Sequence, residues 1–214
     1  MLHGTIVLAE EQTAGIGRLG RSWISQAELG IYCSILLRLT VPPASFPTAS
    51  LVLGLATADA IQKSTLLACD LRWPNDVLIN ERKVAGILTQ LGEGCIVAGI
   101  GINVNQTSLP TDLRTPATSL RMESGGRVQS RETIIVNLLE SVDFFCEILI
   151  ADGPRAILRA FTSASSYVAN RRVIVEESGA KGVTAGLDEN GFLLIRCDSG
   201  RIEKLATGGV RPDR

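Results

Sequence analysis

The chain has 214 residues, 45% of them hydrophobic, so it is long enough for one large domain and one small domain with buried cores. Its 21 Lys and Arg residues nearly balance its 22 Asp and Glu residues, for a formal net charge of -1, which argues against general binding to nucleic acid or to a membrane surface. Because the sequence has no apolar run of about 18 residues and no basic-then-apolar leader, we expect neither a membrane span nor export.

The cysteines and the single histidine limit the chemistry that we expect. The cysteines are isolated, with no CxxC pair, and most have apolar neighbours: Cys33, Cys69, Cys95, Cys146 and Cys197. We interpret them as buried thiols of a cytoplasmic protein. The only histidine is His3, so a Ser-His-Asp, Cys-His or His-rich metal site would have to use it. We therefore expect catalysis to depend on Lys, Arg, Asp and backbone donors.

The first predicted strand, Thr5–Ala9, leads into a loop that is rich in glycine and arginine, QTAGIGRLGRSW at residues 12–23. Its glycines leave N–H groups free to surround an anion, and Arg18 and Arg21 suit carboxylate or phosphate. Trp23 adds a flat apolar surface. The loop opens no helix and lacks GxxxxGK[ST], which argues against a Rossmann fingerprint and excludes a P-loop. A flexible, solvated turn is the alternative interpretation.

The next segments predict a strand over residues 31–39 and a helix over residues 46–63. The motif RWPNDVLINERKVAGIL follows at residues 72–88, with a rigid turn, a strand at 77–79, a polar turn and a second strand from Lys83. We expect the hairpin to bring Asp76 and Lys83 to the same end of the strand pair. A carboxylate facing a lysine there suits nucleotide and Mg²⁺ chemistry. An ordinary hairpin with a surface ion pair is the alternative.

A further strand at residues 95–104 contains AGIGINVN at residues 98–105. Its alternating glycines would leave one face of the strand bare, as they would beneath a ligand, and Asn103 could then point a polar group into the site. The same pattern is also typical of a strand that packs tightly against a helix. For this segment alone the two interpretations are about equal.

The second half of the chain changes character after Tyr167. Residues 106–129 are irregular, Ser130 is a predicted N-cap for a helix over residues 131–151, and a second helix runs to about residue 162. Four short strands of period two are then expected at residues 172–176, 181–187, 192–196 and 201–205. We predict a catalytic α/β domain over residues 1–165 and a small β-barrel domain over residues 166–214.

These three motifs, in this order, resemble the biotin protein ligases, whose patterns are GRGRxGRxW, KWPNDhhh…KhAGIL and GIGINhN, with h an apolar residue. The resemblance covers nearly the whole chain. It implies an α/β (α+β) fold: a mixed sheet with helices packed on it, of the class II synthetase-like type, and an SH3-like C-terminal β-barrel. No helix-turn-helix precedes the first motif, so the chain resembles the enzyme-only class, and no DNA partner is expected.

The resemblance assigns a role to each matching residue. Biotin-binding residues would be Gln12, Gly15, Gly17, Arg18, Arg21, Trp23, Lys83 and Gly86. ATP-binding residues would be Arg21, Asn75, Asp76, Lys83, Asn103 and Arg171. Lys83, Arg18 and Asp76 would be catalytic, and Asp76 would also lie near a bound Mg²⁺.

The implied activity is ATP-dependent attachment of biotin to a lysine of a biotin carboxyl carrier domain, through biotinyl-5′-AMP, with ATP and Mg²⁺ as cofactors and biotin as substrate. The expected partner is the carrier domain of acetyl-CoA carboxylase, with no membrane partner, and a homodimer is one option. One alternative is a lipoate or octanoate ligase or transferase of the same fold. The other is a truncated, non-catalytic relative that binds nucleotide or a carrier domain, against which Arg18, Asp76 and Lys83 argue.

Two departures from the family pattern affect the biotin site. Ile16 stands where the family has its first loop arginine, which removes one cation. The family also has a helix with a Ser-Thr-Asn motif upstream of the strand that matches Thr5–Ala9, and the given sequence starts at that strand. We therefore expect this form to bind biotin more weakly than a form with that helix.

Overall fold

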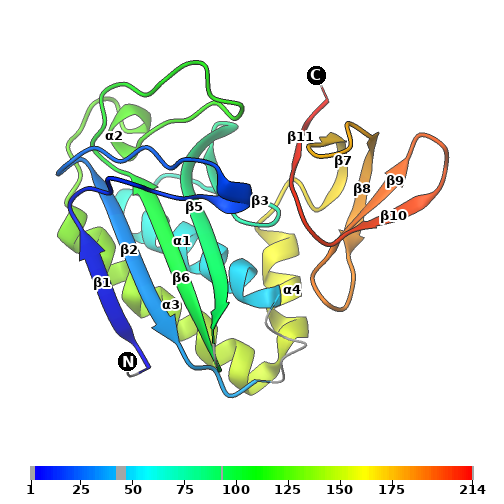
Figure 1. Ribbon diagram of the computed structural model, residues 1–214, viewed down its shortest axis with the longest axis horizontal. Coiled ribbons are helices and arrows are strands. Elements are labelled where there is room, and N and C mark those ends of the chain that lie inside the picture. Colours follow the sequence, from blue (N-terminus) through cyan, green and yellow to red (C-terminus); the bar gives the residue numbers. More distant parts are fainter. Residues whose placement is uncertain (1–2, 42–46, 93, 214) are drawn as a thin grey trace.

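A computed structural model of the chain describes residues 3–41, 47–92 and 94–213. Within them lie two β-sheets and a layer of helices (Figure 1). The first sheet has the strands β1 (Thr5–Ala9), β2 (Gly30–Leu37), β3 (Asp70–Arg72), β4 (Asp76–Ile79), β5 (Arg82–Gly92) and β6 (Cys95–Asn103). Helix positions are α1 (Ala49–Thr65), α2 (Leu120–Glu123), α3 (Arg131–Asp152) and α4 (Pro154–Ser163), with a 3-10 turn, η1 (Arg18–Gly20).

The strand order of the first sheet is β1-β2-β6-β5-β4-β3. The combination of helices and sheets confirms the predicted α/β (α+β) class. Every pairing between the strands of the first sheet is antiparallel, so the expectation of a mixed sheet is wrong. An isolated parallel bridge joins Lys83 to Ala117. Strand β3 and helix α2 were not predicted from the sequence. Both are only three or four residues long, which is too short for a periodic pattern.

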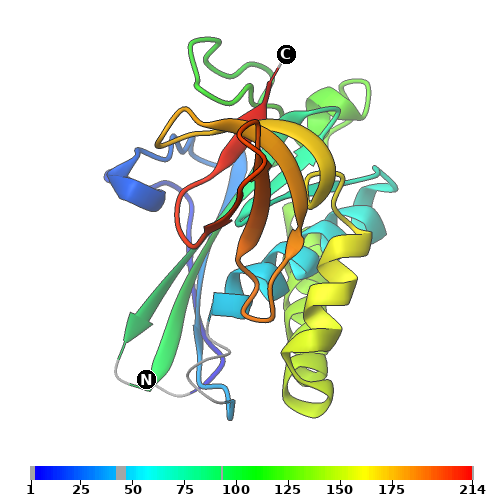
Figure 2. The same cartoon turned by 90° about the vertical axis from the view of Figure 1, so that its right-hand side faces the viewer.

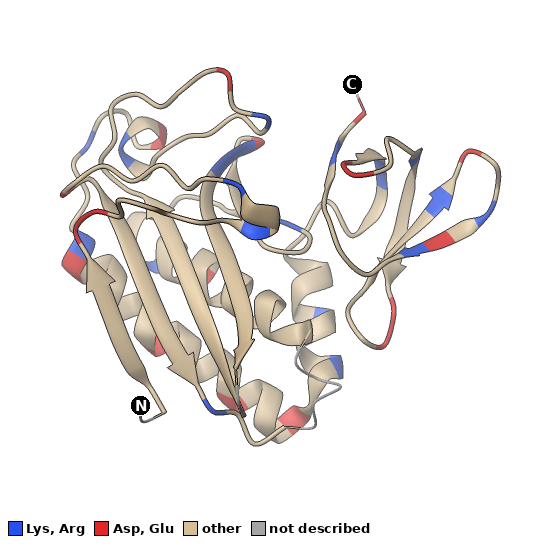
Figure 3. Ribbon diagram, viewed as in Figure 1, with Lys and Arg blue, Asp and Glu red and all other residues tan. Residues whose placement is uncertain are grey.

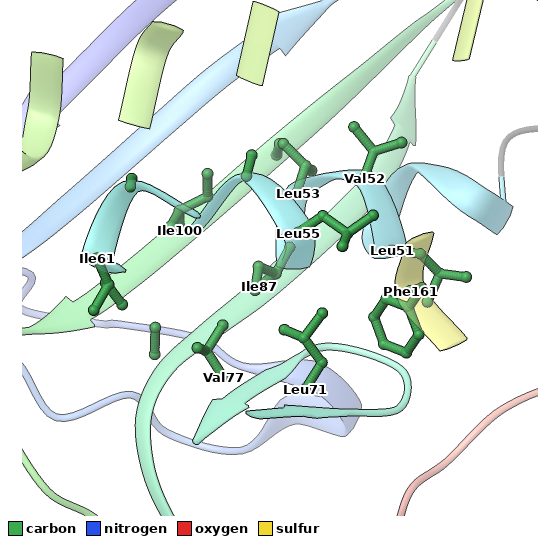
Figure 4. Packing of buried hydrophobic residues seen from close by; sticks show 14 of the residues in the cluster. Leu51, Val52, Leu53, Leu55, Ile61, Leu71, Val77, Ile87, Ile100 and Phe161 are labelled. Carbon is green, nitrogen blue, oxygen red and sulfur yellow. The ribbon is translucent and has the colours of Figure 1, made fainter. Parts of the chain in front are cut away.

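The long helices cover one face of this sheet and leave the other face to the loops (Figures 1 and 2). Helix α1 supplies a row of buried aliphatic residues that pack on Ile87 and Ile100 of the central strands (Figure 4). In β6 the residues alternate: Ile100 and its even-numbered neighbours face the core, and the glycines between them face the other side. The sheet therefore has one apolar face under the helices and one nearly bare face.

The helix ends follow the predicted signals. Ser130 caps α3 by accepting a hydrogen bond from the backbone N–H of Thr133 at 3.1 Å. Gly153, at a φ of 77°, ends α3, and Pro154 begins α4. Helix α1 begins at Ala49, three residues later than predicted, and Phe46 lies outside the described residues.

The C-terminal sheet contains β7 (Ala169–Val175), β8 (Lys181–Leu187), β9 (Leu193–Cys197), β10 (Ile202–Leu205) and β11 (Val210–Pro212). Its order is β10-β9-β8-β7-β11, with antiparallel pairing. Four of these strands were predicted, and they agree with the expected SH3-like β-domain. The missed strand, β11, is three residues long and follows Gly208 and Gly209. The domain boundary that we predict, between residues 165 and 166, falls in the connection between α4 and β7.

No helix in the described part of the chain has the length and apolar character needed to cross a membrane. All five cysteines are free thiols. Cys33 and Cys146 are buried, and their burial raises the pKa of each thiol to about 11. The other three are only partly buried, so the expectation of buried thiols holds for two of the five.

Candidate active site

The β4–β5 hairpin brings Lys83 into contact with Asp76, with 2.5 Å between Nζ and Oδ1. The contact was predicted, but the reason given for it was wrong. The strands pair Asp76 with Gly86 and Lys83 with Leu78, so the two residues lie at different levels of the hairpin. The lysine side chain bridges this offset by running along the strand. An ordinary surface ion pair would join residues that lie opposite each other on the two strands, whereas Lys83 and Asp76 are offset.

A β-bulge explains why Lys83 can take this path. The pairing register shifts between Val77 and Leu78, which leaves Val84 of β5 as an extra residue. Such a bulge interrupts the alternation of side chains. Val84 is fully buried in the core, while Lys83 and Gly86, three residues apart, share the opposite face. A Cβ added at Gly86 would lie 2.9 Å from Nζ of Lys83 and 3.0 Å from the Trp23 ring, so a side chain there would displace the lysine tip or the indole.

Asp76 has a cationic donor on each carboxylate oxygen. Arg72 Nη2 lies 2.5 Å from Oδ2, and Lys83 Nζ takes Oδ1. Burial alone would raise the pKa of Asp76, but the charges and hydrogen bonds of Lys83 and Arg72 outweigh it and hold the pKa at about 2. Asp76 is therefore ionised at neutral pH. Its two oxygens hold Arg72 and Lys83 beside each other in the site.

The bare face of the sheet carries the indole of Trp23. Gly86 of β5 pairs directly with Gly101 of β6, and a Cβ added at Gly101 would lie 2.5 Å from the indole ring. The indole also lies 5.5 Å below Nζ of Lys83, measured to the ring centroid. The missing side chain of Gly101 thus faces Trp23 rather than a helix, so the tight-packing alternative is wrong for this residue. Buried Nε1 of Trp23 has no hydrogen-bond partner within the described residues.

The glycine- and arginine-rich loop closes on itself instead of forming an open turn. Trp23 N–H donates to Gly15 O at 2.8 Å, and Gly17 N–H donates to Arg21 O at 2.6 Å. A Cβ at Gly15 would meet Trp23 O at 2.5 Å, which requires glycine at that position. The loop is therefore ordered by its own backbone hydrogen bonds, but most of its residues are exposed, so the solvated part of the alternative interpretation holds.

Arg18 leaves this loop and reaches both halves of the molecule. Its Nη1 donates to Asn75 Oδ1 at 3.3 Å and to Gly208 O, in the C-terminal sheet, at 2.9 Å. Burial lowers the pKa of Arg18, and the nearby Asp76 partly opposes that shift, so the guanidinium stays charged. Asn75 is held in turn by its Nδ2 donating to Ile87 O at 2.7 Å.

Two cavities meet at these residues. One, about 210 Å³ in volume, is lined by Asp76, Asn103 and part of the C-terminal sheet, and we call it the Asp76 cavity. The other, about 240 Å³, is lined by Gly86, Gly101 and Gln12, and we call it the Gly86 cavity. The residues that line both cavities are Gly17, Arg18, Trp23, Asn75 and Lys83. Two cations and an amide therefore stand on the boundary between the two cavities.

Most of the predicted site residues line one or both of these cavities. The predicted ATP residues in the Asp76 cavity are Arg21, Asn75, Asp76, Lys83 and Asn103. The predicted biotin residues in the Gly86 cavity are Gln12, Gly17, Arg18, Trp23, Lys83 and Gly86. Gly15 lines neither cavity and supports Trp23 from behind, and Arg21 lines only the Asp76 cavity.

Arg171 is not brought to the other predicted ATP residues. It lines neither cavity. Its Nη2 pairs with Glu81 in the turn between β4 and β5, and its guanidinium carbon lies 5.0 Å from the ring centroid of Tyr167. Arg171 therefore lies at the turn of the hairpin, where its ion pair with Glu81 joins the hairpin to the C-terminal sheet.

Three charged residues that line the Asp76 cavity and form ion pairs there had no predicted role. Arg72 was within the motif but had no assigned role, although its position four residues before Asp76 was the available signal. Arg114 and Glu176 come from the irregular segment and from the end of β7. Nothing local marks either residue, because their contacts join segments that are far apart in the sequence. His3, which accepts from Arg38 N–H at 2.9 Å, lines neither cavity.

The site does not form a metal centre from protein ligands. No cluster of three His, Cys, Asp or Glu residues that could hold a metal occurs in the described part of the chain. Both oxygens of Asp76 already accept from cations. Since Mg²⁺ often binds through substrate phosphates and few carboxylates, this donor set fits a metal that arrives with a nucleotide better than one that the protein holds by itself.

Charged side chains gather along the loops at the end of the sheet near these cavities, while the middle of the strands is free of charge (Figure 3). Positive groups come from the glycine- and arginine-rich loop, from β3 and from the start of β5, and negative groups come from Asp76 of β4 and from the C-terminal sheet. The arrangement can hold two anionic groups close together, one in each cavity, with Arg18 and Lys83 between them.

Comparison with known proteins gives a consistent family. The Biotin/lipoate A/B protein ligase family matches residues 2–106. The chain is 33% identical to the biotin--[acetyl-CoA-carboxylase] ligase of Mycobacterium tuberculosis, over 98% of this chain and 79% of that protein. It is 34% identical to the bifunctional ligase/repressor BirA of Bacillus spizizenii, over 97% of this chain but only 66% of that protein, slightly less than two thirds.

The solved structures agree with these relatives. The biotin protein ligase of Aquifex aeolicus, in complex with biotin and ATP, superposes with a TM-score of 0.86 at 32% identity, and the match covers 99% of this chain and 89% of that chain. The likeness extends through the C-terminal β-sheet. This chain belongs to the biotin/lipoate A/B protein ligase family, among the biotin protein ligases.

Proposed function

We propose that this protein attaches biotin to a specific lysine of a biotin carboxyl carrier domain, with ATP, through biotinyl-5′-AMP. The observation that carries the proposal is the shared wall of the two cavities, where Arg18, Asn75 and Lys83 contact both. Biotin would lie in the Gly86 cavity and ATP in the Asp76 cavity. The Aquifex aeolicus relative, solved with biotin and ATP together, supports this assignment.

In the first step, a carboxylate oxygen of biotin attacks the α-phosphorus of ATP. A new oxygen–phosphorus bond forms, the bond to the bridging oxygen breaks, and pyrophosphate leaves with the electron pair. The two reactants repel each other because both are anions. Arg18 and Lys83, on the boundary, would offset that repulsion and stabilise the charge that develops in the transition state.

In the second step, the neutral amine of the carrier lysine attacks the acyl carbon of biotinyl-5′-AMP. An amide bond forms, AMP leaves, and the amine loses a proton to solvent or to the departing phosphate. The described site offers no histidine for this transfer, and none is needed, because AMP is a good leaving group. Water must be excluded until the carrier arrives, since it would hydrolyse the mixed anhydride.

The residue roles are part of the proposal. Gly86, Gly101 and Gln12 line the biotin cavity, and the Trp23 indole lies against both glycines. On the nucleotide side, Asp76 would act through position: it holds Lys83 and Arg72 rather than touching phosphate itself. Asn103, whose Nδ2 donates to Thr118 O at 3.1 Å, would support the same wall. Gly15 and Arg171 would support the site from outside the cavities.

We treat Mg²⁺ as part of the nucleotide substrate. The metal would supply charge neutralisation on the phosphates, and the described residues fit this role because the site's single central carboxylate, Asp76, is already paired. A direct bond from Asp76 to the metal stays a prediction. It would require Arg72 or Lys83 to release one carboxylate oxygen.

The proposed partner is the carrier domain of acetyl-CoA carboxylase, by likeness to the relatives named as ligases of that carboxylase. We propose a cytoplasmic reaction, since ATP is available there and the described thiols are unpaired. We further propose a division of labour in which residues 1–165 bind both substrates and residues 166–214 close the nucleotide side. A homodimer and the absence of DNA binding stay predictions.

Binding assays separate this proposal from its alternatives. Thermal shift is measured for the whole chain with biotin, lipoate or octanoate, each with and without ATP and Mg²⁺. Stabilisation by biotin that increases with ATP supports the proposal. Stabilisation by lipoate or octanoate in place of biotin would favour the other branch of the family. Stabilisation by nucleotide alone, with no pyrophosphate release on adding any acid, would indicate a non-catalytic binder.

A further inference from the structure

The C-terminal sheet forms one wall of the Asp76 cavity, and Glu176 makes the central contact of that wall. Glu176 directly follows β7, and its side chain is 5% exposed. Its Oε2 accepts from Arg21 Nη2 at 3.1 Å and lies 3.9 Å from Arg114 Nη1. Arg114 Nη2 also donates to the backbone oxygen of Glu176 at 2.7 Å. One residue of the C-terminal sheet therefore joins two loops of the first domain.

Each of these loops carries part of the proposed active site. Arg21 lies in the glycine- and arginine-rich loop, two residues before Trp23. Arg114 lies in the segment of residues 106–119, whose backbone holds Lys83 on both sides: Lys83 N–H donates to Pro116 O at 2.8 Å, and Thr118 N–H donates to Lys83 O at 2.9 Å. The ion pairs of Glu176 thus reach the two segments that fix Trp23 and Lys83.

A second contact attaches the same wall to the loop. Gly208, in the turn before β11, accepts a hydrogen bond from Arg18 through its backbone oxygen at 2.9 Å. A Cβ added at Gly208 would lie 2.0 Å from Oε2 of Glu177, and its φ of +87° also favours glycine. The backbone of this turn is therefore positioned to receive Arg18. Three arginines of the first domain are therefore bound by Glu176 and the turn at Gly208, which are joined by the hydrogen bond from Glu176 N–H to Gly209 O at 2.9 Å.

We propose that Glu176 is a positioning residue that holds both loops closed over the cavities, and so retains the acyl-adenylate until the carrier lysine arrives. This inference rests on the proposed function. Glu176 is buried, while the side chains of Arg21 and Arg114 are 46% and 47% exposed, so its charge orients the two loops and its removal lets both arginines turn to solvent. Without this contact, water would enter and attack the acyl carbon of the adenylate, which gives free biotin and AMP.

The variant Glu176→Gln tests the proposal, because it removes the charge and keeps the shape of the side chain. The matched control is Glu203→Gln. Glu203 lies in β10 of the same sheet, its Oε1 lies 3.8 Å from Nε of Arg201, and it lines neither cavity. Both variants lose one negative charge that faces an arginine, but only Glu176 is bound to arginines of the first domain.

The first measurement needs no substrate. Amide hydrogen exchange of the free, full-length protein should be about tenfold faster in residues 15–23 and 108–118 of Glu176→Gln than in the wild type. Glu203→Gln should match the wild type in these segments. Equal exchange in both variants would show that Glu176 does not hold the two loops, whatever the enzyme's activity.

The second measurement follows the fate of the adenylate. With biotin, ATP and a carrier domain, we count pyrophosphate released per biotin transferred. The ratio should be near one for the wild type and Glu203→Gln, and should rise by several-fold for Glu176→Gln. A ratio near one in Glu176→Gln would refute retention by this residue. If the wild type released no pyrophosphate with biotin, the proposed function would fail instead. The exchange result would still decide whether Glu176 holds the two loops.

Discussion

The side chain of Lys83 runs past Gly86, the strand partner of Asp76, to reach the Asp76 carboxylate. Nζ and Oδ1 are 2.5 Å apart although the hairpin pairs Lys83 with Leu78 and Asp76 with Gly86. The bulge at Val84 turns the lysine to the face of the sheet that carries Gly86, and the missing side chain there leaves a path for the lysine. The contact therefore depends on three features of one hairpin, and each can be changed separately.

Lys83→Ala should stop adenylate formation while the protein stays folded. The neutral variant loses a donor to the reacting phosphate, which is worth about 10²–10³-fold in rate or more. Pyrophosphate release measures this step. The matched control is Arg82→Ala, since Arg82 pairs with Glu123 at 2.6 Å and lines neither cavity. Wild-type pyrophosphate release by Lys83→Ala would remove Lys83 from the mechanism.

Gly101→Ala should disturb the biotin cavity, and Gly99→Ala should not. A Cβ at Gly101 would meet the Trp23 indole at 2.5 Å, whereas a Cβ at Gly99 would have only ordinary contacts, the nearest at 3.7 Å. Overpacking of this kind costs about 1–3 kcal/mol, so biotin affinity should fall by about tenfold or more in Gly101→Ala. Titration calorimetry of both variants measures it. Equal loss in both would mean that Trp23 does not rest on the glycine pair.

Asp76 should make stability depend on acid pH. Its pKa is about 2 when folded and 3.8 in its ordinary range, so the unfolded state binds the proton more readily. The stabilisation is therefore complete above about pH 4 and is lost as the pH falls toward 2, by about 2 kcal/mol for a shift of this size. Urea unfolding of wild type and Asp76→Asn from pH 7 to pH 3 measures this. Parallel pH curves for the two proteins would contradict the assignment.

Arg18→Gly should release the adenylate prematurely. The variant loses the bonds from Nη1 to Asn75 and to Gly208, and with them a cation between the two cavities. Free biotinyl-5′-AMP acylates exposed lysines on any nearby protein, so biotin should appear on a bystander such as serum albumin. Streptavidin blots with carrier domain and albumin together compare the two targets. Labelling confined to the carrier would show that Arg18 does not retain the intermediate.

The sequence supported most of the strands and helices, because their apolar residues follow clear periods. It also supported the cluster of Arg18, Asn75, Asp76 and Lys83, since the motifs place charged and amide groups at the ends of apolar strands. It could not show the bulge at Val84, which depends on how β4 and β5 settle against each other. The contact was therefore predicted with the wrong register.

Other parts of the site depend on contacts that no local pattern reveals. Glu176 meets Arg21 across 155 residues of sequence, and the charge of one glutamate at the end of a strand is typical of a solvated turn. The resemblance assigns Arg171 to ATP, yet Arg171 pairs with Glu81 and lines neither cavity. Strands β3 and β11 are too short for a period to be recognised.

The most direct test of the central claim is the intact mass of a carrier domain after incubation with this protein, biotin, ATP and Mg²⁺. We predict a gain of one biotin less one water on a single lysine, dependent on ATP, with one pyrophosphate and one AMP released. Lipoate and octanoate in place of biotin should leave the mass unchanged. An unchanged carrier mass with biotin, in a protein that binds both biotin and ATP, would contradict the account.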